Sequence, residues 1–385
     1  MKNKIVELIA ANVEGLTAAE IADLIEIPPK PELGDFAFPC FRLAKTMRKA
    51  PQMIANDIKE AIGDVDFLQE IQVQGAYLNF FVKKELFIET MVTASMADDF
   101  GSSTEGNGQT ICIDYSSPNV AKNFHVGHLR TTIIGNSLYK IYSKLGYKVV
   151  RINHLGDWGT QFGKLIVAYK AWGSEEAVKK DGVAELMKLY VKFHEEAEKN
   201  PELNDEARAW FAKMEHGDEE ALKIWQWFKD ISLIEYKRTY DLLGMDFDYY
   251  LGESFYRDKT DDVVKRLTDA NLLTESEGAK IVNLDAYDMA PCLILKNDGS
   301  SIYATRDIAA IFYRKETYNF VKCLYVTGQE QKLHFKQVFK VVELLGNEWA
   351  KDQLVHIPYG LVSLEGAKLS TRSGNIICED QRDHQ

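Results

Sequence analysis

The chain has 385 residues, 46% of them hydrophobic and 27% charged, a composition typical of globular proteins with room for two or three domains. Its formal net charge of −12 argues against a general nucleic-acid coat, although a restricted basic surface could still hold a nucleic acid. There is no membrane-length apolar run, no secretory signal pattern and no CxxC among the five cysteines. We therefore expect a cytoplasmic protein without a membrane segment or a disulfide framework.

The first part of the chain, residues 1–105, is predicted to form a small, separate α+β domain. Thr17-Ala-Ala-Glu20 has the spacing of a capping box at the start of a helix. IQVQGAYLNFFV, residues 71–82, predicts strand structure interrupted at Gly75. The polar segment DDFGSSTEGNGQT, residues 98–110, is typical of a linker or loop.

The remainder, residues 106–385, is predicted to be an α/β domain. ICIDY, residues 111–115, has the pattern of a short apolar strand, and apolar residues then recur at helical spacing from about 127 to 145. Gly146 ends the predicted helix, and YKVVRIN follows as a second strand. Strand, helix and strand in this order favour a parallel, Rossmann-like sheet with a right-handed crossover.

A helical insertion is predicted next. Residues from about 172 to 245 are rich in charge, have helical spacing and show no strand pattern. Strand and helix patterns resume with PCLILKNDGSSIYATRDIAAIF and continue through VHIPYGLV. The sequence contains no internal repeat.

The loop after the first strand of this α/β domain carries two histidines, His125 and His128, at the start of the predicted helix. Free N–H groups at a helix N-terminus favour an anion, and α/β sheets bind ligands beyond the carboxyl ends of their strands. Gly127 leaves room for a ring or ribose, so both imidazoles could stabilise a reacting phosphate. A structural role or metal ligation is the alternative for this motif alone. Because no further ligands lie nearby in the sequence, we expect no metal there.

The motif that contains the two histidines also resembles a motif of a known protein family. His125-Val-Gly-His128 resembles the first nucleotide-binding motif of class I aminoacyl-tRNA synthetases. The strings SSPNVAKNFHVGHLRTTIIGN, GDWGTQFGKL, YATRDIAA, KLSTRSGN and GDFAFPCFRLAK resemble the arginyl-tRNA synthetase family, through almost the whole chain. The resemblance implies ATP-dependent activation of L-arginine to arginyl-adenylate, with Mg²⁺ bound to the substrate, and transfer to the 3' end of tRNA(Arg). It implies no zinc, and we expect a monomer.

The resemblance assigns one group of residues to ATP. His125 and His128 match the family's ATP-contacting pair. In the activation step the arginine carboxylate attacks the α-phosphate, which requires positioning and charge neutralisation more than a general base. The other residues expected at ATP are Pro118, Gly127, Gly328, His334 and Val362.

The second class I motif has the form Lys368-Leu-Ser-Thr-Arg372, in which Lys368 and Ser370 match and Thr371 replaces a lysine. Lys122 matches a lysine that this family often carries when the loop lysine is missing, and its ammonium could reach the same phosphates. A solvated loop charge is the alternative reading of Lys122, and Arg372 is a rival for its role. The expected catalytic residues are thus His125, His128, Lys122, Lys368, Ser370 and Arg372.

A guanidinium is a planar fork of donors, so arginine selection requires carboxylates. Asp114 ends the first predicted strand and Asp307 follows a Tyr-Ala-Thr-Arg string, although Asp307 could instead cap a helix. An aspartate pair would also disfavour lysine. The resemblance implies an arginine pocket made of Asp114, Ser117, Asn119, Tyr303, Asp307 and Gln331. Trp158 and Gly159 are expected only as pocket wall, and a core aromatic and an ordinary turn are the alternative.

The resemblance also bears on tRNA. It implies that residues 1–105 hold the tRNA near its elbow, where Lys45, Arg48 and Lys49 share the spacing of one helix face; a solvated face is the alternative. The family normally continues into an anticodon-binding domain, which we do not find after Gly374, so we expect reduced charging. Alternatives are a class I enzyme for another amino acid, a nucleotidylyltransferase, or a catalytically weak tRNA-binding module.

Overall fold

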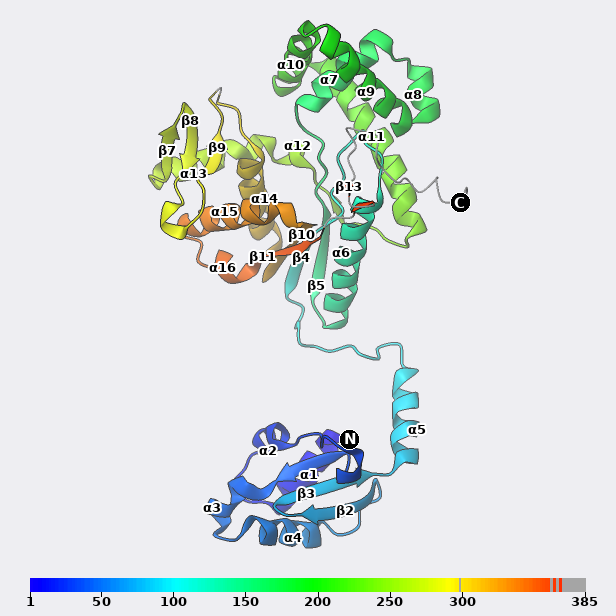
Figure 1. The fold of residues 1–385 in the computed structure, drawn as a ribbon, viewed down its shortest axis with the longest axis vertical. Coiled ribbons are helices and arrows are strands. Elements are labelled where there is room, and N and C mark those ends of the chain that lie inside the picture. The colour runs from blue at the N-terminus through cyan, green and yellow to red at the C-terminus, as the bar shows by residue number, and fades with distance from the viewer. Residues whose placement is uncertain (298, 361–362, 365–366, 369–385) are drawn as a thin grey trace. The chain divides into compact units, whose positions relative to one another are not determined.

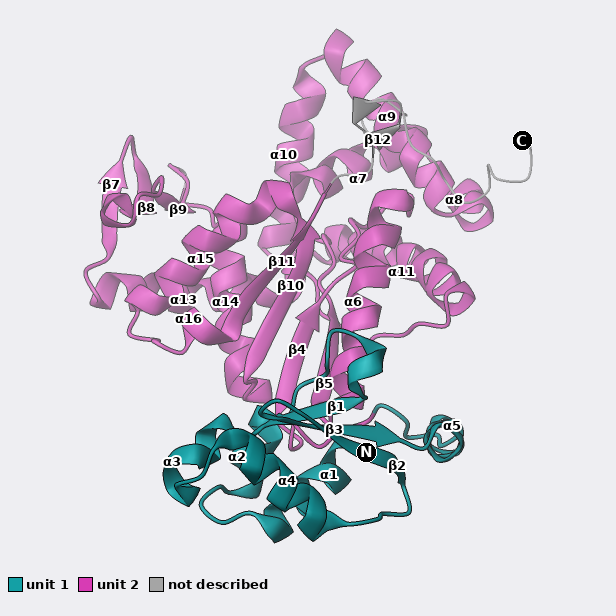
Figure 2. Ribbon diagram, turned by 60° about the horizontal axis from the view of Figure 1, so that its bottom comes forward, with its two compact units in different colours: residues 1–101 teal, residues 102–385 magenta. Residues whose placement is uncertain are grey.

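The computed structural model describes residues 1–297, 299–360, 363–364 and 367–368. The chain divides into two compact units, Met1–Gly101 and Ser102–Gln385 (Figures 1 and 2). The division falls inside the polar segment 98–110, which the sequence indicated as a linker.

Unit 1 contains a three-stranded antiparallel sheet in the order β1-β3-β2. Its strands are β1 (Phe36–Pro39), β2 (Leu68–Gln74) and β3 (Tyr77–Val82), and its helices are α1 (Lys2–Asn12), α2 (Ala18–Leu24), α3 (Leu43–Met47), α4 (Pro51–Ile62) and α5 (Lys84–Ser95). The predicted strand break is confirmed: Gly75 turns between β2 and β3 with φ of +59°, a region that glycine adopts readily. The predicted capping box is confirmed as well, because Thr17 accepts from the Glu20 N–H and Glu20 from the Thr17 N–H.

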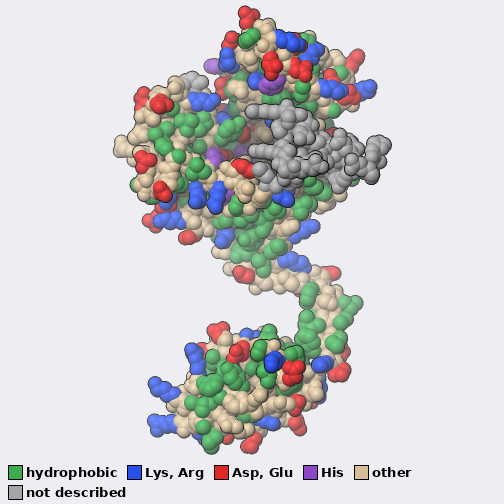
Figure 3. All heavy atoms as spheres, in the orientation of Figure 1, with side chains coloured by type: hydrophobic (Ala, Val, Ile, Leu, Met, Phe, Trp, Pro, Cys, Tyr) green, Lys and Arg blue, Asp and Glu red, His purple; other side chains and the backbone are tan. Residues whose placement is uncertain are grey.

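The core of unit 1 lies between its sheet and α1, α2 and α4. Fully buried side chains of this core include Ile5, Phe38, Ile54 and Phe80. In contrast, α5 buries none of its residues, and its hydrophobic side chains, such as Ile88 and Val92, are exposed (Figure 3). The helix α5 therefore adds nothing to this core.

The basic cluster predicted on one helix face of unit 1 does not form such a face. The helix α3 ends at Met47, and Arg48 adopts a left-handed conformation with φ of 50°. Lys49 then lies beyond the helix, where its Nζ atom is 2.6 Å from Asp57 Oδ2. The prediction was wrong because the spacing assumed a helix that continues past Met47.

Unit 2 is built on a five-stranded parallel sheet in the order β11-β10-β4-β5-β6. These strands are β4 (Thr110–Asp114), β5 (Lys148–Asn153), β6 (Tyr249–Tyr250), β10 (Lys322–Gly328) and β11 (Leu354–Tyr359). The helix α6 (Val126–Lys144) connects β4 to its parallel neighbour β5, so the predicted strand–helix–strand unit is confirmed. Gly146, with φ of +82°, follows this helix as expected.

Alternate residues of the strands face two separate cores. Ile111 and Ile113 of β4 pack into one core, whereas Cys112 packs into the other, as the two-residue period of a strand requires. The first core is shared with α7 (Thr160–Trp172) and α11 (Glu219–Leu242). The second core is shared with α13 (Thr260–Asp269), α14 (Tyr303–Tyr318) and α15 (Lys332–Leu344).

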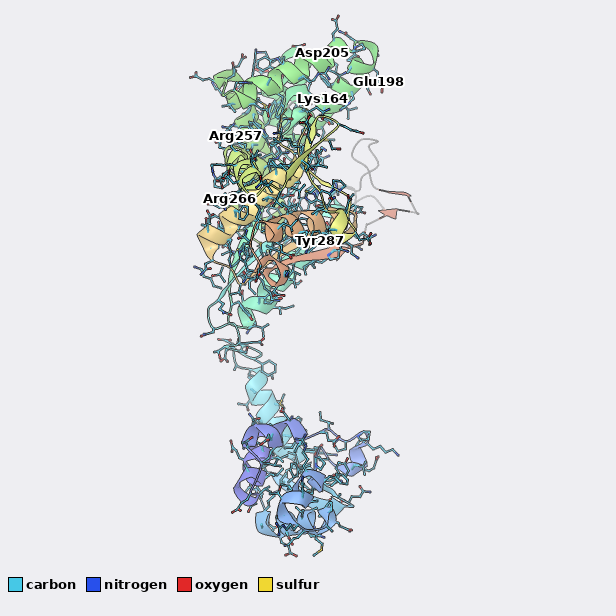
Figure 4. The ribbon with its side chains drawn as sticks, turned by 90° about the vertical axis from the view of Figure 1, so that its left-hand side faces the viewer. Lys164, Glu198, Asp205, Arg257, Arg266 and Tyr287 are labelled. Carbon is cyan, nitrogen blue, oxygen red and sulfur yellow. The ribbon has the colours of Figure 1, made fainter. Side chains whose placement is uncertain are left out.

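The segment between β5 and β6 forms a helical lobe at one end of unit 2, which matches the predicted helical pattern. Besides α7 and α11 it contains α8 (Glu175–Asp181), α9 (Val183–Lys199) and α10 (Glu202–Glu215). Figure 4 shows Lys164, Glu198 and Asp205 on this lobe, apart from Tyr287. Figures 1 and 2 show α11 running from the lobe to the side of α6.

The remaining elements follow the lobe. They are α12 (Glu253–Tyr256), β7 (Leu273–Ser276), β8 (Ala279–Val282), β9 (Cys292–Leu295), α16 (Ala350–Gln353), β12 (Ser363–Leu364) and β13 (Ala367–Lys368). Strands β7, β8 and β9 form a small antiparallel sheet, and β12 pairs with β13. No helix in the part of the chain that the structure describes is long and apolar enough to cross a membrane.

The order of the five parallel strands locates the ligand-binding edge. The chain moves from β4 to β5 on one side and later returns to β10 and β11 on the other. The connections therefore reverse direction between β4 and β10, and a crevice opens beyond the carboxyl ends of strands at such a reversal. Asp114 and Gly328 are the last residues of these two strands.

Candidate active site

The loop between β4 and α6 is held in an unusual backbone conformation. Ser116, Ser117 and Ala121 have φ values of 71°, 47° and 61°, in the left-handed region that residues other than glycine rarely adopt. Such residues persist only where their surroundings compensate the cost, and they cluster at functional sites.

Helix α11 supplies much of that compensation. The Tyr236 hydroxyl donates to the carbonyl oxygens of Asn119, at 2.7 Å, and Lys122, at 2.8 Å. The Ser232 hydroxyl accepts from the Ala121 N–H at 2.9 Å. These contacts join residues more than a hundred positions apart, so the loop conformation depends on the helical lobe.

The two predicted histidines form the N-terminal cap of α6. His125 is the N-cap residue, and its Nδ1 atom accepts from the Gly127 N–H at 3.1 Å. The His128 Nδ1 atom accepts from the His125 N–H at 3.3 Å, and the rings stack with centroids 3.9 Å apart. A Cβ atom on Gly127 would lie 2.9 Å from His125 Cε1, so the glycine gives space to this ring. Because both Nδ1 atoms accept, the neutral rings carry their protons on Nε2.

Both histidines are neutral near pH 7. Burial, together with the neighbouring His125 and the Lys122 charge, lowers the pKa of His128 to about 3. Burial and Lys122 also lower the pKa of His125. The pair therefore offers two Nε2–H donors at a helix N-terminus, whose dipole favours an anion.

Two cavities open side by side beyond the strand ends. The histidine cavity has a volume of about 290 Å³ and is lined by Ser116, Ser117, Asn119, His125, Gly127, His128, Thr131, Val326, Thr327, Gly328, Glu330, Gln331 and Tyr359. The carboxylate cavity has a volume of about 450 Å³ and is lined by Asp114, Ser117, Asn119, His154, Gly156, Glu253, Tyr303, Asp307, Tyr325, Thr327, Gln331, His334 and Phe335. Ser117, Asn119, Thr327 and Gln331 line both, so the cavities adjoin.

The first carboxylate of the carboxylate cavity is neutralised from within the protein. Asp114 Oδ2 lies 2.7 Å from Nη2 of Arg314, which is fully buried on α14. Asp114 Oδ1 accepts from the Ser117 hydroxyl at 3.0 Å. Both carboxylate oxygens thus already have partners, and Asp114 links the sheet to the strained loop.

The second carboxylate, Asp307, lies one turn inside α14. The N-cap of α14 is Ile302, so the alternative of Asp307 as a helix cap is excluded. His334 Nε2 lies 2.5 Å from Asp307 Oδ2, and His154 Nε2 lies 4.0 Å from Oδ1. Burial raises the pKa of Asp307, but the His334 hydrogen bond and the neighbouring His154 and Arg314 charges outweigh it and hold the pKa below its usual value.

The third carboxylate, Glu253 at the start of α12, was not among the predicted residues. It is 8% exposed, and its Oε2 atom lies 3.2 Å from Arg306 Nη2. Burial raises the pKa of Glu253 to about 8, against the opposing charge of Arg306. The Arg306 guanidinium also lies over the Tyr303 ring, 5.1 Å from its centroid.

Some of the missed residues carried a usable signal. His154 directly follows β5, at the same carboxyl edge as Asp114, and Arg314 follows Asp307 by two helical turns on the same face of α14. Glu253 had no such signal, because a helical lobe of many residues separates β5 from α12.

All six residues expected at arginine line the carboxylate cavity, and His125, His128, Gly127 and Gly328 line the histidine cavity. His334, which was expected at ATP, lines the carboxylate cavity beside Asp307. Pro118 is buried, and its carbonyl oxygen accepts from the Gly156 N–H at 3.1 Å.

Among the other predicted residues, Lys122 and Trp158 line neither cavity. The Lys122 ammonium lies 6.0 Å from the ring centroid of Tyr190 on α9. Lys368 belongs to β13, whereas Val362, Ser370 and Arg372 lie outside the described residues. Trp158, expected in the pocket wall, packs in the first core of unit 2. Within the described residues, no cluster of three or more His, Cys, Asp or Glu side chains could hold a metal ion.

Comparisons with known proteins identify the family. The family model of the class I (R) tRNA synthetase catalytic domain matches residues 91–381, and that of the arginyl-tRNA synthetase N-terminal domain matches residues 3–82. The chain belongs to the arginyl-tRNA synthetase family.

Individual relatives support the same family. The arginine–tRNA ligases of Alkaliphilus metalliredigens and Clostridium perfringens are 56% and 57% identical over 378 residues, 98% of this chain. The chain spans about two thirds of these relatives, 67% and 66% of their lengths. The structure of Thermus thermophilus arginyl-tRNA synthetase has the same fold, with a TM-score of 0.65, 21% identity, and coverage of 96% of this chain and 67% of that one.

The family relationship confirms the predicted resemblance and the α/β fold with a small N-terminal unit. Its members are ligases that join arginine to tRNA, and residues 91–381 match their catalytic domain. Both cavities lie within these residues. The two cavities are therefore the candidate sites for the family's reaction, arginine activation and tRNA charging.

Proposed function

We propose that the chain activates L-arginine with ATP across its two cavities, arginine entering the carboxylate cavity and the ATP phosphates the histidine cavity. The observation that carries the proposal is their shared wall of Ser117, Asn119, Thr327 and Gln331. There, an arginine carboxylate oxygen would bond to the α-phosphorus while the bond to pyrophosphate breaks. The product would be arginyl-adenylate, whose arginyl group then passes to the 3' end of tRNA(Arg).

In this proposal the carboxylate cavity selects the guanidinium. Glu253 and Asp307 supply acceptors from two different elements, and Tyr303, which is 60% exposed, lies at the mouth. A planar guanidinium can donate to both carboxylates, whereas the single ammonium of lysine cannot satisfy them equally. Asp114, held by Arg314, is proposed to orient Ser117 near the α-amino group.

The histidine cavity is proposed to hold the phosphates. The Nε2–H groups of His125 and His128 would donate to oxygens that gain charge in the displacement, and the N-terminus of α6 adds its dipole. Mg²⁺ bound to the ATP would supply positive charge against the leaving pyrophosphate. Lys122 is proposed to add a further cation, together with Lys368 and Arg372.

Unit 1 is proposed to hold the tRNA near its elbow. The basic residues Lys45, Arg48 and Lys49 remain the expected contact, although the pairing of Lys49 with Asp57 reduces the net charge available there. A cytoplasmic location and a monomeric state also stay predictions.

Arginine-dependent exchange between ATP and pyrophosphate tests this function. The chain is assayed with arginine, lysine and citrulline, each with and without tRNA(Arg). We expect exchange with arginine alone among the three, because citrulline has the shape of arginine but no charge. Exchange with another amino acid would indicate a different class I enzyme. Absence of exchange with tRNA present would favour the binding-module alternative.

A further inference from the structure

Asp157, in the loop between β5 and α7, is a fully buried carboxylate outside both cavities. Its Oδ1 atom accepts from the Ser254 N–H at 2.8 Å, and its Oδ2 atom accepts from the Ser254 hydroxyl at 2.7 Å. A single carboxylate thus binds both the backbone and the side chain of the residue that follows Glu253.

The same carboxylate is tied to the helical lobe. Lys229 Nζ on α11 lies 2.6 Å from Asp157 Oδ2, and the Lys229 side chain is 15% exposed. Trp225, one turn earlier on α11, donates from Nε1 to the Asp157 carbonyl oxygen at 2.7 Å. Charge-assisted hydrogen bonds at a buried site are strong and restrict geometry closely.

The segment 252–254 is fitted tightly against Asp157. A Cβ atom on Gly252 would lie 2.4 Å from the Asp157 carboxylate, so only glycine allows this approach. The Glu253 N–H donates to the Leu155 carbonyl oxygen at 3.0 Å. Glu253 is therefore held from both sides, while its own carboxyl faces the carboxylate cavity.

We infer that Asp157 is a positioning residue for the arginine site: it fixes segment 252–254, and with it Glu253, to helix α11 of the lobe through Lys229. The inference rests on the proposed function of the carboxylate cavity. Through these contacts the helical lobe helps to fix a residue of the proposed arginine site, and the lobe also supports the strained loop between β4 and α6. Anything that shifts α11 would move Glu253 relative to Asp307.

The connection can be tested without changing any residue that lines either cavity. Ser254→Ala removes one hydrogen bond to Asp157 and leaves every charge in place. Ser254→Thr retains the hydroxyl and serves as the conservative rescue. Lys229→Met removes the ion pair, and its matched control is Lys170→Met, which breaks an ion pair with Glu220 between α7 and α11.

Calorimetric titration of the full chain with L-arginine, and separately with ATP, gives the readout. We expect Ser254→Ala and Lys229→Met to weaken arginine binding about tenfold, because a small displacement of a recognition group has effects of this size. The affinity of these two variants for ATP should stay within about twofold of that of the parent chain. The Ser254→Thr variant and the Lys170→Met control should also bind arginine within about twofold of the parent chain.

Three results would overturn the inference. If the parent chain binds arginine and both variants bind it equally well, Asp157 has no positioning role, and the proposed function stands. If arginine and ATP binding weaken together, the effect is a general loss of structure. A parent chain that binds no arginine, with or without tRNA, would overturn the proposed function and this inference with it.

Discussion

Arg314 and Asp114 form an ion pair that is almost completely enclosed, with 2.7 Å between Nη2 and Oδ2 and side-chain exposures of 1% and 8%. The pair joins α14 to the end of β4, where Asp114 lines the carboxylate cavity. One of the chain's own guanidinium groups thus lies against a carboxylate of the cavity that we propose binds arginine. This guanidinium balances the charge of Asp114 from within the protein.

Arg314→Met is expected to destabilise the chain by about 3–5 kcal/mol, because it leaves a buried carboxylate without a counter-ion. Urea unfolding followed by circular dichroism measures the free energy of unfolding. The double variant Asp114→Asn/Arg314→Met should recover a large part of the loss, since it buries no lone charge. Equal instability of the single and double variants would mean that packing, and not charge balance, sets the cost.

Local patterns in the sequence were sufficient to predict the strands and the helix that carry this site. The period change around Gly127 predicted β4, α6 and β5, because the spacing of apolar residues follows directly from strand and helix geometry. Asp114 was found because a polar residue ends an apolar strand. Even the two histidines were placed correctly at the start of α6, although their mutual capping bonds were not foreseen.

The rest depends on contacts between distant segments. Glu253 lies at the cavity because Asp157 and Leu155 hold segment 252–254. No spacing of residues in the sequence predicts these contacts. The left-handed turn at Arg48, which ended α3 early, likewise defeated a prediction based on helical spacing. Tertiary contacts override local preference at such positions.

Arginine binding is expected to depend on pH through Glu253. Burial raises the pKa of Glu253 to about 8, so the free chain carries this carboxyl protonated at pH 7. A bound guanidinium favours the charged form and expels the proton. The association constant should therefore rise up to about tenfold per pH unit between about pH 6 and 8 and level off above. Calorimetric titrations with arginine across this range measure it.

Glu253→Gln is the control for this dependence, because it removes the titrating group and should flatten the slope. ATP binding should show no matching slope. The same proton also affects stability: the unfolded chain releases it near the ordinary glutamate pKa of 4.5 and the folded chain near a pKa of about 8. The contribution of Glu253 to the free energy of unfolding consequently falls as pH rises through this interval.

His125 can be tested for its two roles separately. His125→Asn retains an acceptor for the N-terminal N–H groups of α6, whereas His125→Ala loses it and should cost about 1 kcal/mol of stability. Both variants lack the Nε2–H donor, so both should lose about 100-fold in the rate of ATP–pyrophosphate exchange. If His125→Asn exchanges as fast as the parent chain, the histidine serves only as a helix cap.

Tyr236 offers a test of the support that α11 gives to the loop between β4 and α6. Tyr236→Phe removes one hydroxyl, which donates to the carbonyl oxygens of Asn119 and Lys122, and changes no side chain that lines a cavity. We expect a loss of about 1–3 kcal/mol in stability, because two carbonyl groups lose a buried donor.

The same variant should bind arginine and ATP more weakly together, since Asn119 lines both cavities. This joint loss distinguishes it from Ser254→Ala, which should affect arginine alone. Tyr169→Phe on α7 is the matched control, because it also removes one hydroxyl and its ring packs against Phe228 of the same helix α11. Equal losses in the two tyrosine variants would show that α11 stabilises the lobe without setting the conformation of residues 116–122.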